Sequence, residues 1–271
     1  MTGTIYLLRH GQADSSAAGR GEWQRGMEEQ YDRLTRVGHR QAQLVTAELQ
    51  RRLKGGAALV SGPLRRQRDT LAPLSQSLGL SPTVMEGWCE FNSDSVVAPY
   101  LDEHPEERDR LADIYRQAAN GEDRELLLEG HRLLGVVLDR ALGRWVEAPA
   151  FQDFRRQVLG AFAAVVEIAQ ERDVVVATSG GPISVIVSSL FGSNFRHLIG
   201  RTYTASLTVL RILPGGLGAN ADGWVGGVRQ LEVALLDGGD RDMGGLTPVR
   251  LVSYNEHSHL FDGAERLLHL R

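Results

Sequence analysis

The sequence predicts an α/β protein, built as a three-layer sandwich around a mainly parallel central sheet. Short apolar runs alternate along the chain with longer segments of helical periodicity, which is the pattern of strand–helix–strand units. The run at 174–177 is apolar at every position, as expected of a parallel strand that helices cover on both faces. With 271 residues, 42% of them hydrophobic, the chain is long enough to bury a sizeable core.

The composition excludes several classes of protein. A net charge of −4 disfavours a nucleic acid as the main partner. Cys89 is the only cysteine, so neither an intrachain disulfide nor a cysteine metal cluster can form. The first residues lack the basic and apolar regions of a signal peptide, and no apolar run is long enough for a membrane helix. We therefore expect a cytoplasmic protein without a membrane partner, and a homodimer is left open.

The first 90 residues predict three strands and two helices. Thr35 is the expected N-cap of the first helix, in which Ala42, Val45 and Leu49 fall on one face. The polar segment 14–33 is expected to be a loop. The expected strands are 4–8, 57–60 and 83–85, and the expected helices are 35–54 and 64–78.

The remainder predicts a helical insertion followed by the other half of the sheet. Residues 96–148 are helical in pattern and rich in Asp, Glu and Arg, and we expect them to form a lid within a single domain, 1–271. Residues 214–246 carry many glycines and predict a loop or irregular hairpin. The other expected elements are helix 151–172, strand 173–178, a helix ending near 191, strands 206–213 and 249–253, and a short C-terminal helix.

Charged and polar residues follow the predicted parallel strands, whose carboxyl ends meet at one edge of the sheet. Arg9 and His10 follow the first strand, a group of arginines follows the second, Glu90 the third, and Ser179-Gly180-Gly181 opens a helix after the fourth. Arginines and a helix N-terminus suit a phosphate, a histidine suits nucleophilic attack, and a carboxylate suits proton transfer. This combination predicts phosphoryl transfer, with no cofactor and no metal.

Six segments carry the motifs of one known protein family, in the order in which that family has them. They are Leu8-Arg9-His10-Gly11-Gln12-Ala13, the segment 34–42 (LTRVGHRQA), the segment 61–70 (SGPLRRQRDT), Trp88-Cys89-Glu90-Phe91-Asn92, Thr178-Ser179-Gly180-Gly181 and the segment 255–260 (NEHSHL). The first five resemble motifs of the histidine phosphatases, also called the phosphoglycerate-mutase-like superfamily, and the sixth is similar to a segment in a bacterial branch of that family. Together the six segments span nearly the whole chain.

The resemblance implies a role for each matching residue. His10 would be the nucleophile that forms a phosphohistidine, with Arg9 and Arg66 holding the phosphoryl oxygens. Arg66 matches the family spacing better than Arg65, and we expect Arg65 and Arg68 on an exposed helix face. Glu90 would be the acid and base, with Glu86 and Asp94 as rival carboxylates.

The sequence departs from the family pattern at three places: at Ser179, at Gln12-Ala13 after the nucleophile, and in the segment around Glu90. Ser179 stands where the family has a second histidine, so that the Ser179 hydroxyl and the backbone of Gly180 are left to bind phosphate. His257 or His259 would supply an imidazole from the end of the last strand, unless they are surface residues. Gln12, Ser15 or Ser16 would replace the polar side chains that many members carry in the loop after the nucleophile.

We therefore expect a metal-independent phosphomonoesterase that acts on a small phosphorylated metabolite. Two alternatives stay open. A catalytically weak phosphate-binding regulatory protein is suggested by Ser179 alone. A mutase would move phosphate within one substrate, but the segment around Glu90 lacks the pattern of the glycolytic mutases.

Overall fold

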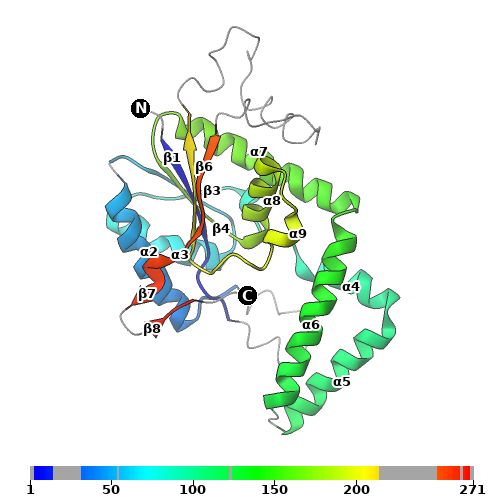
Figure 1. The fold of residues 1–271 in the computed structure, drawn as a ribbon. Helices are drawn as coiled ribbons and strands as arrows, with labels where there is room; N and C mark the ends of the chain where they lie inside the picture. Colours follow the sequence, from blue (N-terminus) through cyan, green and yellow to red (C-terminus); the bar gives the residue numbers. More distant parts are fainter. Residues whose placement is uncertain are drawn as a thin grey trace. The chain divides into compact units, whose positions relative to one another are not determined.

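The chain folds into two compact units in a computed structural model (Figure 1). The structure describes residues 3–14, 32–53, 55–121, 124–213, 249–262 and 265–268. The first unit comprises Met1–Ala13, Leu34–Glu90 and Phe154–Arg271, and the second comprises Asp14–Arg33 and Phe91–Asp153. The sheet lies in the first unit, and the predicted insertion 96–148 lies in the second.

The first unit is built on a six-stranded sheet in the order β3-β2-β4-β1-β5-β6. The strands β3, β2, β4 and β1 are parallel neighbours, and β5 and β6 complete the sheet in the antiparallel direction. The mainly parallel sheet predicted from the sequence is therefore confirmed. The bounds are β1 Thr4–Arg9, β2 Ala58–Ser61, β3 Thr83–Val84, β4 Val174–Thr178, β5 Leu207–Ile212 and β6 Val249–Glu256.

Strand β4 lies between β2 and β1, and all five of its residues are buried. This is the arrangement that its unbroken apolar run predicts. Its register pairs Thr178 with Arg9 of β1, and Ala177 with Ser61 of β2. The residues that follow these three strands therefore begin at the same edge of the sheet.

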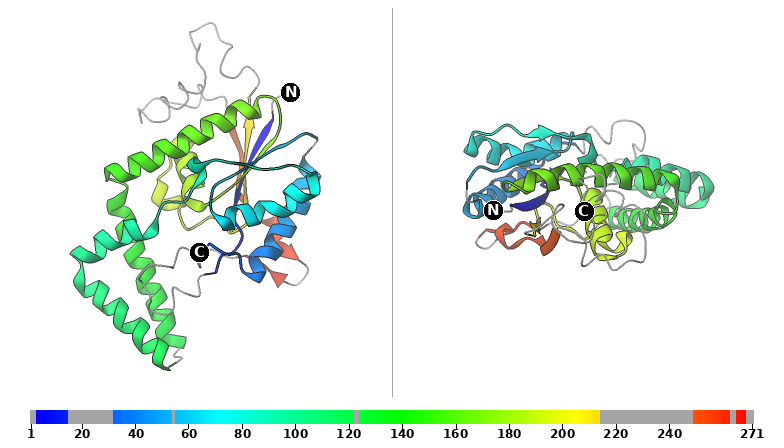
Figure 2. Two further views of the ribbon diagram at one scale, coloured as in Figure 1. Left: turned by 180° about the vertical axis from the view of Figure 1, so that it is seen from behind. Right: turned by 90° about the horizontal axis from the view of Figure 1, so that it is seen from above.

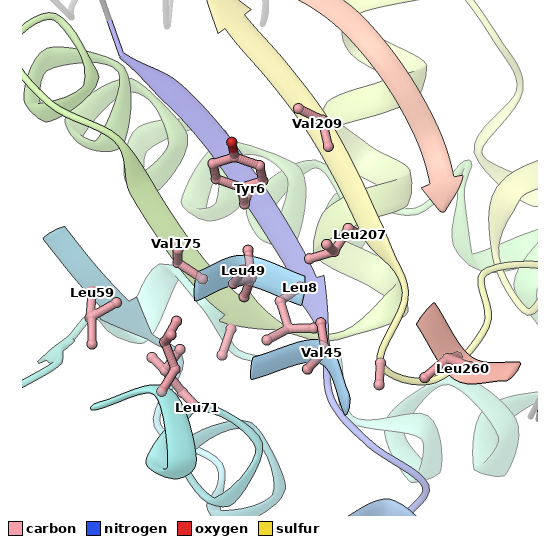
Figure 3. Packing of buried hydrophobic residues seen from close by; sticks show 13 residues of the cluster. Tyr6, Leu8, Val45, Leu49, Leu59, Leu71, Val175, Leu207, Val209 and Leu260 are labelled. Carbon is pink, nitrogen blue, oxygen red and sulfur yellow. The ribbon is translucent and has the colours of Figure 1, made fainter. Parts of the chain in front are cut away.

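Helices cover both faces of the sheet, so the predicted three layers are present (Figures 1 and 2). Helices α2 (Arg36–Arg52) and α3 (Arg65–Leu78) lie on one face, and α7 (Pro149–Ala169) and α8 (Gly180–Phe191) lie on the other. Figure 3 shows the core under α2 and α3, where alternate residues of the strands meet the apolar stripes of the two helices. Its members include Tyr6, Leu8, Val45, Leu49, Leu59, Leu71, Leu74, Val175, Ala177, Leu207 and Val209.

Local sequence signals set the ends of these helices. Thr35 caps α2, since its side-chain oxygen accepts the Gly38 N–H at 3.0 Å. Helix α3 ends at Gly79, which has the left-handed φ of 65° that glycine adopts without strain. Pro149 is the first residue of α7, a position where a missing N–H costs nothing.

The second unit contains helices α4 (Ser93–Glu103), α5 (Pro105–Gly121) and α6 (Arg124–Trp145). Aromatic residues pack within the unit: Tyr115 is fully buried, and the Phe91 and Trp145 rings are 4.8 Å apart. Arg144 and Glu103 pair at 2.6 Å on exposed helix faces. The helical character of 96–148 is confirmed, and its role as a lid stays a prediction.

The short C-terminal helix expected after the last strand is wrong. A single 3-10 turn, Ser258–Leu260, is followed by a small antiparallel pair, β7 (Phe261–Asp262) and β8 (Glu265–Arg266). Leu260 and Leu267 are both buried, and their separation of seven positions imitates a helical stripe. They are brought together by a hairpin, in which Leu267 N–H donates to the Leu260 carbonyl at 3.2 Å.

The predictions for 15–31 and 214–246, including Ser15 and Ser16, lie outside the described residues. In the parts of the chain that the structure describes, no helix is long and apolar enough to cross a bilayer.

Candidate active site

His10 follows β1 and is 2% exposed. Its backbone N–H donates to the Thr178 carbonyl at 2.9 Å, which fixes it beside the end of β4. Its ring Nδ1 lies 2.7 Å from the Gly11 carbonyl oxygen. Because a carbonyl can only accept, Nδ1 carries a proton, and Nε2 is the nitrogen that holds the lone pair when the ring is neutral. That tautomer is the form that a nucleophilic imidazole needs.

Gly11 is held by a buried threonine of α3. The Gly11 N–H donates to Thr70 Oγ1 at 2.9 Å, and the Thr70 hydroxyl donates to the Arg66 carbonyl at 2.6 Å. A Cβ on Gly11 would lie 2.7 Å from the Gly38 carbonyl oxygen, so a side chain does not fit there. Thr70 thus connects the loop after β1 with the helix that carries Arg66.

Two arginines of this edge are buried, and two are not. Arg9 is 4% exposed and Arg66 is 5% exposed, whereas Arg65 and Arg68 lie on the open face of α3. Arg65 pairs with Asp69 at 3.2 Å. The Arg9 guanidinium donates through Nη1 to the Thr202 carbonyl. Burial therefore distinguishes Arg66 from Arg65 in the way that the motif spacing predicts.

The N-terminus of α8 lies next to Arg9 and Glu90. A Cβ on Gly180 would be 3.8 Å from Arg9 Nε, which places the guanidinium against the first residue of the helix. Gly181 N–H donates to Glu90 Oε2 at 3.1 Å. The backbone donors of α8, a guanidinium and a carboxylate therefore meet at one point.

The rival carboxylates are placed differently from Glu90. Glu86 begins a 3-10 turn, Glu86–Trp88, and its carbonyl accepts Gln157 Nε2 at 3.0 Å. Asp94 belongs to the second compact unit. Glu90 is the carboxylate that hydrogen-bonds the first turn of α8.

Ser179 is fully buried at the N-cap of α8, and its Oγ accepts a hydrogen bond from Gln67 Nε2 at 2.9 Å. Gln67 is adjacent to Arg66 in α3 and is also fully buried. No role is predicted for Gln67 from the sequence, because a glutamine among arginines gives no signal of burial. Its partner, Ser179, is 112 positions away.

Gln12 is half-buried in the loop after His10. Its backbone N–H donates to Gln41 Oε1 at 2.7 Å, and its own Oε1 accepts the Thr35 hydroxyl at 2.7 Å. The side chain that was expected to reach phosphate is thus anchored to the N-cap of α2.

The two C-terminal histidines have other partners. His257 Nδ1 is 2.7 Å from the Asn255 carbonyl oxygen, and its ring centroid is 4.5 Å from that of Tyr203. His259 Nε2 is 2.8 Å from the Ala205 carbonyl oxygen, and burial lowers the pKa of His259. Among the described residues, no contact places either ring where Ser179 stands.

The edge of the sheet combines two buried guanidinium groups, the N-terminus of α8, an imidazole and a carboxylate. Two fixed positive charges and the N–H of Gly180 at the helix N-terminus suit a tetrahedral oxyanion. Among the described residues, no group of three or more His, Cys, Asp or Glu side chains has an arrangement that could hold a metal ion.

The sequence also matches a known protein family. The sequence profile of the histidine phosphatase superfamily (branch 1) matches residues 5–221. The chain belongs to the histidine phosphatase superfamily. This membership supports an enzyme of the phosphatase or mutase type.

Solved structures show the same fold. "Mycobacterial hydrolase 1" is 20% identical, with 93% of this chain and 98% of that chain covered and a TM-score of 0.52. Phosphoserine phosphatase of Entamoeba histolytica, solved with 3-phosphoglyceric acid, is 13% identical, with 95% and 99% covered and a TM-score of 0.52. No curated protein sequence matches the chain. At these identities the likeness shows the fold alone.

Proposed function

We propose that this member of the superfamily is a phosphomonoesterase that acts through a phosphohistidine at His10 and needs no metal ion. The observation that carries the proposal is the hydrogen bond from His10 Nδ1 to the Gly11 carbonyl. It assigns the lone pair of the neutral ring to Nε2, on a buried ring at the sheet edge where Arg9 and Arg66 are also buried.

In the first step, Nε2 of His10 attacks phosphorus in line, and the bond between phosphorus and the leaving oxygen breaks. Glu90, protonated in this step, gives its proton to that oxygen. Arg9, Arg66 and the N–H of Gly180, the first residue of α8, stabilise the negative charge that builds on the equatorial phosphoryl oxygens. Donors fixed by burial need no rearrangement to do so.

In the second step, water attacks the phosphorus of the phosphohistidine, and the P–N bond breaks. Glu90, now a carboxylate, takes a proton from the water, and Nε2 regains its lone pair. Inorganic phosphate leaves. The hydrogen bond from Nδ1 to Gly11 keeps the ring in one orientation through both steps.

The proposed substrate is a small phosphorylated metabolite, and residues 96–148 are proposed as a lid that selects it. Phosphatase is preferred to mutase because the segment around Glu90 lacks the residues by which glycolytic mutases hold a bisphosphorylated substrate. Release of inorganic phosphate distinguishes the two, since a mutase returns an isomer without net release.

The test is phosphate release from p-nitrophenyl phosphate between pH 4.5 and 8, with EDTA present throughout. The wild type is expected to be active and His10→Ala inactive. His39→Ala is the matched control, because His39 is an exposed histidine of α2; its rate should equal that of the wild type. Activity that survives in His10→Ala, or that EDTA abolishes, would overturn the proposal.

A further inference from the structure

Ser179 is an unusual N-cap. A serine in this position normally accepts the N–H of the second or third helical residue, but no such bond is made here. The second residue, Gly181, donates to Glu90, and the third, Pro182, has no N–H. The Ser179 hydroxyl therefore does not cap the helix.

Gln67 hydrogen-bonds the Ser179 hydroxyl instead. One Nε2–H donates to Ser179 Oγ at 2.9 Å and the other to the Trp88 carbonyl at 2.9 Å, while Oε1 accepts Leu64 N–H at 3.1 Å. The amide thus has a partner for both of its donors and for its oxygen. Its orientation is fixed, because exchanging the oxygen and nitrogen would set the amide oxygen against the Trp88 carbonyl.

The direction of the Gln67–Ser179 bond determines what the serine can do. A hydroxyl has one hydrogen to donate. Since Ser179 Oγ accepts from Gln67, that hydrogen is kept for another acceptor, and the structure gives Ser179 no other hydrogen bond among the described residues. The pair lies between two phosphate-binding segments: Gln67 follows Arg66, and Ser179 precedes Gly180.

We propose that Gln67 is a positioning residue that turns Ser179 into a hydrogen-bond donor for the phosphoryl group, in the place where the superfamily motif has a second histidine. The inference rests on the proposed function. A buried amide–hydroxyl pair replaces the imidazole of the motif. Gln67 donates a hydrogen bond to the Ser179 oxygen, and the Ser179 hydroxyl donates a hydrogen bond to the phosphoryl group of the substrate.

The environment of the pair supports an effect on Ser179 rather than on the whole site. The Trp88 carbonyl also accepts the Thr178 hydroxyl at 2.9 Å, so it keeps a partner when Gln67 is removed. Gly62 makes room for the amide, because a Cβ there would lie 2.1 Å from Gln67 Oε1. Ser179 is then the side chain whose single hydrogen bond is lost, while the half-buried Leu64 N–H at the start of α3 loses its acceptor.

The test is a double-mutant cycle with Gln67→Leu and Ser179→Ala. Ser179→Ala removes a donor to the transition state, and about a 100-fold fall in kcat is expected. Gln67→Leu should lower kcat by about 10- to 100-fold, and the double variant should be no slower than Ser179→Ala. If the two single effects multiply in the double variant, Gln67 does not act through Ser179 and the proposal fails.

Gln41→Leu is the matched control. Gln41 is also a fully buried glutamine, but its Nε2 donates to Thr204 Oγ1 at 2.9 Å and to the Leu267 carbonyl at 2.7 Å. Its effect on kcat should multiply with that of Ser179→Ala, whatever its size. Thermal unfolding of each variant identifies any that do not fold; if Gln67→Leu does not, Gln67→Met takes its place in the cycle.

A second readout separates this proposal from the proposed function. The affinity for orthovanadate, a mimic of the five-coordinate phosphoryl group, is measured by calorimetry for the same four proteins. Wild type that binds vanadate without hydrolysing p-nitrophenyl phosphate would refute the phosphatase, yet the coupling of Gln67 with Ser179 would still be read from the affinities. Equal vanadate affinities in the wild type and Ser179→Ala would refute the donor role of Ser179.

Discussion

Thr70→Val tests whether the fold holds the loop after His10 in place through one hydroxyl. Valine has nearly the shape of threonine, so the substitution removes the hydroxyl from a fully buried site and leaves the packing. The Arg66 carbonyl lies within α3 and retains its helical N–H partner. Gly11 N–H, however, loses the Thr70 oxygen that accepts it at 2.9 Å.

A buried N–H without an acceptor costs about 1–3 kcal/mol. For a protein of this size, that corresponds to a fall of roughly 2–12 °C in Tm, at about 2–4 °C per kcal/mol. The activity should fall as well, because the Gly11 carbonyl is the acceptor that orients His10 Nδ1. We expect kcat to decrease more than KM rises, since the nucleophile is misplaced while the arginines remain.

Thr46→Val is the control within the same chain. Thr46 is also a buried helical threonine, in α2, but its Oγ1 has no hydrogen-bond partner in the described part of the protein. The same change of chemistry should therefore alter Tm by less than 2 °C, on the scale of an ordinary neutral substitution. Thermal unfolding and steady-state kinetics are measured on both variants. Equal losses of Tm and kcat in the two variants, or no loss in Thr70→Val, would show that the Thr70 hydroxyl does not hold the loop after His10.

Three further predictions concern the arginines, His259 and the buried pair. Arg66→Ala should lower kcat/KM by at least 100-fold and Arg65→Ala by less than twofold, since one guanidinium is buried at the site and the other is exposed; equal effects in p-nitrophenyl phosphate kinetics would contradict this. Burial lowers the pKa of His259 below its ordinary 6.5, against the opposing effect of Glu48 and Glu256 and with Arg52 nearby. The unfolded chain then binds the proton first, so stability should fall as the pH drops below about 6.5, by at most about 1.4 kcal/mol per pH unit; His259→Gln should flatten the pH dependence of Tm, and an unchanged dependence would contradict this. Ser179→His should destabilise by about 1–3 kcal/mol through overpacking, and adding Gln67→Ala should restore Tm; a double variant as unstable as the single would show that the two side chains do not share one space.

The sequence predicts the sheet well because its strands carry strong local signals. The unbroken apolar run of β4 indicates its central place, and Thr35 marks the start of α2 before any tertiary contact is known. The C-terminal segment misleads, because Leu260 and Leu267 have helical spacing and yet meet across a hairpin. Local periodicity does not reveal which partner a short apolar segment will find.

The candidate site is predictable where its residues follow strands, and not where they act through other side chains. His10, Arg9 and Glu90 follow strands of the sheet, so their meeting at one edge is deduced from topology. Gln67 and Thr70 lie in the same segment as Arg66, 61–70, and their side chains are buried. Their roles depend on hydrogen-bond partners from elsewhere in the chain. Only the fold brings Gln67 to Ser179, and no pattern in either segment points to the other.

The phosphohistidine at His10 can be detected directly, as phosphate bound to the enzyme. Glu90→Gln cannot take a proton from the attacking water, so a phosphorylated enzyme should accumulate when this variant is mixed with p-nitrophenyl phosphate and quenched in alkali. We expect an acid-labile, alkali-stable phosphate on the peptide that contains His10, and none in His10→Ala. Phosphate release by the wild type with no phosphorylated enzyme in any variant, or a phosphate bound to another residue, would rule out His10 as the nucleophile.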